Sequence, residues 1–184
     1  MLNKALRTLF IYNGIFVFAW GLLGPLYAVF VQDITQNVVI ITFSWALFLF
    51  ASTLGTFFLS RVGDKIKEKE YLLIAGYILR AFVWTAYIFV DSVAMLLLLQ
   101  IIFGIGDALG TPAFNALMAE HLDKGRHIEE YSDMMILFNL CTGLATVIGG
   151  IIVQQYGFNT LFVIMAALTL ISIFGLYNKP RRLL

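Results

Sequence analysis

Polar and small residues form a stripe along the otherwise apolar stretch 93–118. Gln100, Gly104, Asp107, Thr111 and Asn115 recur every three or four residues, and on an α-helix they fall within an arc of roughly 80°. The stretch is long enough to cross the apolar core of a bilayer, about 30 Å thick. An ionisable side chain at that depth is costly unless it faces a cavity or a partner. Asp107 therefore indicates a functional or paired site.

Two kinds of chemistry would place Asp107 inside a membrane. A carboxylate facing an aqueous cavity can bind a solute or take up a proton, because poor hydration favours its neutral form. Alternatively it forms a structural ion pair, most simply with Arg80. That arginine lies midway along the apolar segment 71–90, with Tyr77, Trp84 and Tyr87 on the same helical face. The sequence leaves both roles open.

Two further apolar segments carry polar stripes. Asn13, Trp20, Gly24 and Tyr27 share one arc of the segment 9–31, and the segment 131–153 carries Ser132, Asn139, Gly143, Thr146 and Gly150. Hydrogen bonds between helices, worth roughly 0.6–2 kcal/mol each, would explain any one of these polar residues. Three stripes together favour a shared aqueous cavity. We expect its substrate-binding side chains to be Asn13, Trp20, Tyr27, Gln100, Asp107, Thr111, Asn115 and Asn139.

The composition indicates a membrane protein. Of the 184 residues, 61% are hydrophobic and 12% charged, which is more apolar surface than a soluble domain of this size needs. A net charge of +1 predicts no nucleic-acid partner. The single cysteine, Cys141, offers no disulfide framework and no metal cluster. Because no nucleophile elbow and no His-Glu-x-x-His motif occur, we expect neither an enzyme nor a cofactor.

Six apolar segments of spanning length define the predicted topology, within one domain over residues 1–184. We expect membrane helices at approximately 9–31, 38–59, 71–90, 93–118, 131–153 and 158–177. The first follows Lys4 and Arg7 and exceeds a signal-peptide core, so it is interpreted as a retained helix. The positive-inside rule predicts that both termini are cytoplasmic, in the cell or inner membrane. Its evidence is the placement of basic residues before the first helix, in the second and fourth loops and after the last helix: Lys4, Arg7, Arg61, Lys65, Lys67, Lys69, Lys124, Arg126, Lys179, Arg181 and Arg182.

Two pairs of short motifs suggest an internal repeat. Gly24-Pro25 resembles Thr111-Pro112, and Leu54-Gly55 resembles Ile148-Gly149. Helices one and four enter the membrane from opposite sides, so the fold would be a 3+3 inverted repeat.

The loop 60–69, SRVGDKIKEK, resembles the signature between helices two and three of the major facilitator superfamily. Asp64, Lys65 and Lys67 fit that pattern, and Ser60 replaces its leading glycine. Gly104-Ile105-Gly106 with Pro112-Ala113, Gly149-Gly150, and Tyr156-Gly157-Phe158 followed by Phe162 look like later parts of the same family. The resemblance implies that helices one, two, four and five line a cavity, with three and six outside. It also implies that Asp64, Lys65 and Lys67 form a gating loop, which meets the helix start near Glu129–Asp133 of the opposite half.

Three departures from the family pattern matter. Gln100 stands where drug exporters often carry arginine, and Ala145-Thr146 stand where they often carry Gly-Pro. The family has twelve helices, whereas this chain has six predicted. Its two halves are parallel repeats, so a homodimer with two-fold symmetry would rebuild the whole. The sequence does not distinguish a natural half-transporter from a truncation. It also does not show whether the partner is a second copy of this chain or a different half-transporter.

The leading functional hypothesis is a secondary active transporter. Neutral hydrogen-bonding groups and Trp20 suit a small polar organic solute, such as a sugar. Alternating access would occur in a homodimer, with proton-coupled symport through Asp107. Two alternatives stay open: a drug or lipophile exporter of the same family, and a membrane assembly subunit that transports nothing.

Overall fold

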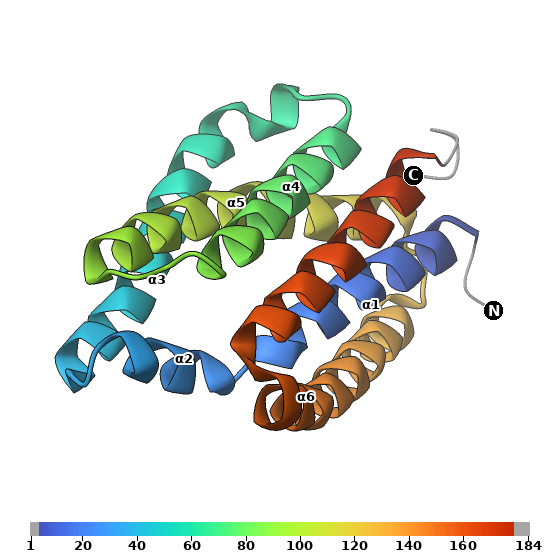
Figure 1. The fold of residues 1–184 in the computed structure, drawn as a ribbon. Coiled ribbons are helices and arrows are strands. Elements are labelled where there is room, and N and C mark those ends of the chain that lie inside the picture. The colour runs from blue at the N-terminus through green and yellow to red at the C-terminus, as the bar shows by residue number, and fades with distance from the viewer. Residues whose placement is uncertain (1–3, 179–184) are drawn as a thin grey trace.

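Helices joined by short loops make up the computed structural model, which describes residues 4–178 (Figure 1). Over that range no strand occurs, so the predicted all-helical class is confirmed. The basic residues Lys179, Arg181 and Arg182 lie outside the described residues. The elements are α1 (Lys4–Leu23), α2 (Leu26–Ile34), α3 (Val38–Val62), the 3₁₀ turn η1 (Gly63–Lys65), α4 (Lys69–Tyr87), α5 (Val93–His121) and α6 (His127–Tyr177).

Glycine and proline explain where the apolar segments bend. Gly24 and Pro25 separate α1 from α2, with Gly24 at a φ of 25°. Gly157 has φ 79° and ψ 173° inside α6, a conformation open to glycine because it lacks a Cβ. The two parts of α6 run in opposite directions along α1 (Figure 1). Pro112, by contrast, lies inside α5 without ending it.

Four helices of the described chain are long and apolar enough to cross a membrane. They are α1, α3 extended through η1, α5 and α6. The α4 helix is not among them, and it contains the charged residues Glu70 and Arg80. Several apolar helices therefore support a multi-pass membrane protein, while the number of six crossings stays a prediction.

The α5 helix packs between α3 and α4, through contacts that only small residues permit. A Cβ added at Gly76 of α4 would lie 2.6 Å from both the Gly106 oxygen and the Gly110 nitrogen. One added at Gly104 would lie 2.6 Å from the Phe48 oxygen of α3. Gly106 and Gly110 thus let α4 approach α5 closely, which sets the distance between the polar groups of the two helices.

We expect Gly76→Ala to reduce stability by roughly 1–3 kcal/mol, because its methyl group must push α4 away from the α5 backbone. The measurement is thermal unfolding in detergent. Gly143→Ala is the matched control, since a Cβ at Gly143 has nothing within 4 Å. Equal melting temperatures for the two variants would contradict this packing.

Two helices present large apolar side chains outward. In α3 only Ser44 and Phe48 are buried, while Phe50 and Phe58 are more than 60% exposed. In the first part of α6, Leu140 and Leu144 are similarly exposed. We call these surfaces the open faces of α3 and α6.

Candidate functional site

Asp107 lies at the centre of a hydrogen-bonded network that joins three helices. Arg80 of α4 donates to its Oδ1 at 2.5 Å, and Thr111, one turn further along α5, donates to the same oxygen at 2.8 Å. Ser52 of α3 donates to Oδ2 at 2.6 Å. The Arg80 side chain is 6% exposed and that of Asp107 31%. The two charges therefore neutralise each other at the edge of the core.

A cavity of about 340 Å³ borders this network, and we call it the Asp107 cavity. Side chains from α1, α3, α4, α5 and the first part of α6 line it. Its polar members are Asn13, Arg80, Asp107, Thr111 and Asn115, together with Tyr77, whose hydroxyl donates to Asn13 Oδ1. Apolar side chains make up most of the remaining wall, so polar contacts to a bound molecule would come from few positions.

A second cavity, of about 350 Å³, adjoins the first, and we call it the Gln100 cavity. Gln100 Nε2 donates to the Tyr27 hydroxyl, which lies 2.7 Å from Ser44 Oγ. Because Ser44 donates in turn to the Ile41 carbonyl, the Tyr27 hydroxyl is the donor toward Ser44. This chain of hydrogen bonds fixes α2, α3 and α5 around the cavity.

Aromatic rings dominate the walls where the two cavities meet. Trp20 and Phe103 line both cavities. The Gln100 cavity adds Tyr27, Trp45, Trp84 and Tyr87, so it contains all three tryptophans of the chain. Such walls bind flat, partly apolar molecules through stacking and burial.

The structure groups most of the residues predicted to bind a solute. Asn13, Trp20, Thr111 and Asn115 line the Asp107 cavity with Asp107 itself, while Tyr27 and Gln100 line the adjoining one. Asn139 lines neither cavity and is exposed on α6. The residues of α6 that do line the two cavities are Met134, Phe138 and Thr142, and none of them belongs to the predicted polar stripe of that segment.

The helix that the family resemblance places outside the cavity contributes to both. Tyr77 and Arg80 of α4 line the Asp107 cavity, and Trp84 and Tyr87 line the Gln100 cavity. Ser52, which donates to Asp107, is a position of the candidate site that sequence reasoning missed. Since α3 carries several hydroxyl residues, nothing in the sequence marks Ser52 as the one that meets Asp107.

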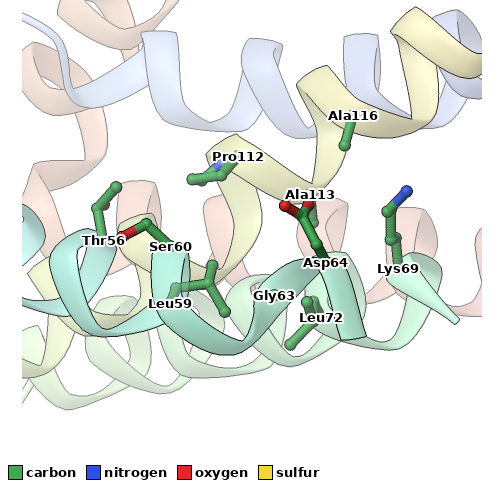
Figure 2. Close-up of a pocket in the computed structure, with 10 residues that line it drawn as sticks. All are labelled: Thr56, Leu59, Ser60, Gly63, Asp64, Lys69, Leu72, Pro112, Ala113 and Ala116. Atoms are coloured by element: carbon green, nitrogen blue, oxygen red, sulfur yellow. The ribbon is translucent and has the colours of Figure 1, made fainter. Parts of the chain in front are cut away.

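Asp64 belongs to a separate cavity of about 260 Å³, between α3, η1, α4 and α5 (Figure 2). Figure 2 shows its carboxylate directed from η1 toward α5 near Ala113. Lys69, on the same cavity, forms an ion pair with Glu120 of α5. Lys65 and Lys67 are exposed and line none of these three cavities.

Glu129 and Glu130, at the start of α6, form contacts within their own chain. Arg126 donates to Glu129 at 2.5 and 3.0 Å, and this contact lowers the pKa of Glu129 and raises that of Arg126. Glu130 is fully buried and accepts a hydrogen bond from the Asp123 backbone at 2.9 Å. Because Glu130 is enclosed within its own chain, it is not accessible to Lys65 or Lys67 of another copy.

These features define an all-helical membrane protein built around polar groups that border cavities. A family model of the Major Facilitator Superfamily matches residues 9–183. The chain belongs to the major facilitator superfamily, a family of membrane transporters.

The relatives include two curated proteins called multi-drug resistance efflux pump PmrA, from Streptococcus pneumoniae serotype 4 and from strain R6 of the same species. Each is 22% identical to this chain over 160 residues. The match covers 85% of this chain and 40% of either relative. The chain thus spans less than half the length of these relatives.

Proposed function

We propose that two copies of this chain form a secondary transporter that works by alternating access, with both termini cytoplasmic. The observation that carries the proposal is the open faces of α3 and α6, which flank the Asp107 cavity. Residues of both helices, Phe48, Met134 and Phe138, line that cavity. A second copy would bury the exposed apolar side chains and enclose the cavity at once. The coverage of the relatives, 40% of their length, agrees with a half-unit.

The same proposal includes the 3+3 inverted repeat, and two glycine contacts support it. Gly55 of α3 packs against Ala108 of α5, where an added Cβ would lie 2.7 Å from the alanine Cβ. Gly149 of α6 packs against the Leu22 backbone of α1. The first contact joins predicted spans two and four, and the second joins spans five and one. A repeat that relates span one to span four and span two to span five would convert one contact into the other, as an internal symmetry requires.

For the solute, the aromatic walls favour an amphipathic organic molecule with a flat ring system. The Arg80–Asp107 pair leaves no net charge at the cavity, so a strong cation or anion gains little there. The name of the relatives points the same way, toward the drug or lipophile alternative. A sugar-like solute is the second candidate, because Asn13, Gln100 and Asn115 supply amide groups beside Trp20.

Transport of two probes into proteoliposomes tests the proposal. Relative to protein-free liposomes, we expect a pH gradient to drive accumulation of radiolabelled chloramphenicol, an uncharged aromatic molecule, more strongly than that of radiolabelled glucose. Greater accumulation of glucose would favour the sugar-like candidate. If folded dimers moved neither solute, the transporter proposal would be wrong and a non-transporting assembly role would replace it.

The loop around Asp64 is proposed as a gate between the two copies. Asp64 lies at the surface near the ends of α3 and α5, where a helix start of the second copy can reach it. Hydrogen bonds from such a positive helix end are worth roughly 0.3–1 kcal/mol, weak enough to break in each cycle.

We expect Asp64→Asn to slow transport several-fold and to shift the balance between inward- and outward-open states. Lys65→Gln is the control for loss of a charge in the same turn; equal behaviour of the two variants would refute a specific role for Asp64.

A further inference from the structure

Two buried hydrogen-bond donors have no partner, and both belong to α4. They are Arg80 Nε and Trp84 Nε1, in residues that are 5% and 0% exposed. A buried donor left without an acceptor is unfavourable. Over the described part of the chain, the one other unpaired buried side-chain atom of this kind is Glu130 Oε1, which lines neither the Asp107 nor the Gln100 cavity.

The two donors lie on the same side of α4, one turn apart, and flank the same pair of rings. The Arg80 guanidinium carbon is 4.9 Å from the Phe16 ring centre and 6.0 Å from that of Phe103. The Trp84 ring lies 5.8 Å from Phe16 and 6.2 Å from Phe103. Arg80 lines the Asp107 cavity and Trp84 the Gln100 cavity, so the two side chains that carry the unpaired donors lie where the cavities meet.

Four acceptor oxygens around this junction already receive hydrogen bonds from the protein. Both oxygens of Asp107 accept hydrogen bonds from Arg80, Thr111 and Ser52. Asn13 Oδ1 accepts from Tyr77, and the Tyr27 hydroxyl accepts from Gln100. The junction therefore holds two buried donors without a partner just behind its aromatic walls, whereas these acceptors are occupied.

From this imbalance we propose that the joined cavities bind flat aromatic solutes that carry a carbonyl-type oxygen, and that this oxygen accepts a hydrogen bond from Trp84 Nε1. Arg80 Nε is the second donor available to the same molecule. This inference rests on the proposed function, because it names the chemical class of the solute. It makes Trp84 a specificity-determining residue on a helix that the family pattern places outside the cavity.

Binding of two probes of matched shape tests the proposal without any transport step. The probes are 7-methoxycoumarin, which carries a lactone carbonyl, and 2-methoxynaphthalene, which does not. Isothermal titration calorimetry of the full chain in nanodiscs, corrected with empty nanodiscs, gives both dissociation constants. We expect the coumarin to bind more tightly. Trp84→Phe keeps the aromatic ring and removes the N–H, so it should weaken coumarin binding about 3- to 10-fold and leave the naphthalene unchanged.

Trp45→Phe is the matched control, because Trp45 lines the same cavity but is 40% exposed and its nitrogen is not an orphaned buried donor. It should preserve the preference for the coumarin. Equal binding of the two probes to the unmodified chain, an equal loss of both in Trp84→Phe, or no binding of either would overturn the proposed class of solute. Chloramphenicol accumulation in proteoliposomes, relative to protein-free liposomes, would still decide the transport proposal separately.

Discussion

Replacing Asp107 with asparagine is expected to lower the stability of the folded chain by on the order of 3 kcal/mol. The variant leaves the Arg80 guanidinium buried without its counter-charge, and breaking one side of a buried pair is costly. Ser52 and Thr111 donate to different oxygens of Asp107, and asparagine keeps one of the two. Its amide group can donate to the hydroxyl that loses its acceptor, so the loss comes mainly from the charge. The measurement is the yield of folded protein and its melting temperature in detergent.

A double variant separates this structural role from proton coupling. Arg80→Met with Asp107→Leu removes both charges, and such apolar replacement of a buried pair is often neutral or stabilising. We expect it to restore folding and to abolish gradient-driven accumulation. If Asp107→Asn were fully stable but failed only in uphill transport, the role of Asp107 would be coupling. A stable Asp107→Asn variant with full uphill transport would show that neither role applies.

Gly143→Trp is expected to separate the two copies without unfolding either. Gly143 lies on the open face of α6, where nothing is within 4 Å of an added Cβ, and Gly150, two turns further, is equally unobstructed. Small residues on a membrane helix allow another helix to approach closely, so an indole there would hold a second copy away. Cross-linking in native membranes should fall to background while the melting temperature of the chain changes little. Phe174→Trp, on an exposed position of the other part of α6, is the control and should leave cross-linking intact.

Sequence patterns predicted the helical class and much of the site because both follow from local periodicity. The stripe on 93–118 placed Asp107, Thr111 and Asn115 on one side of one helix, and they do line one cavity. The sequence left two roles open for Asp107, a cavity carboxylate or an ion pair with Arg80. It could not decide between them because the pair depends on how α4 and α5 approach each other.

Those patterns could not predict contacts between segments that are distant in the sequence. Ser52 meets Asp107 because Gly104 lets α3 approach α5, and neither residue signals the other in sequence. Trp84 enters the Gln100 cavity because α4 packs inward at Gly76, against the family expectation for that helix. On α6, Met134, Phe138 and Thr142 line the cavities in place of Asn139, because packing between helices decides which face of a helix turns toward a cavity.

The central claim, that one chain supplies half of a transporter, is tested most directly by the mass of the particle. Native mass spectrometry of the chain released from nanodiscs should give twice the mass of one 20.7 kDa chain. The same preparation should accumulate chloramphenicol in proteoliposomes, above the level in protein-free liposomes. A particle with the mass of a single chain that still transports against a gradient would contradict the account.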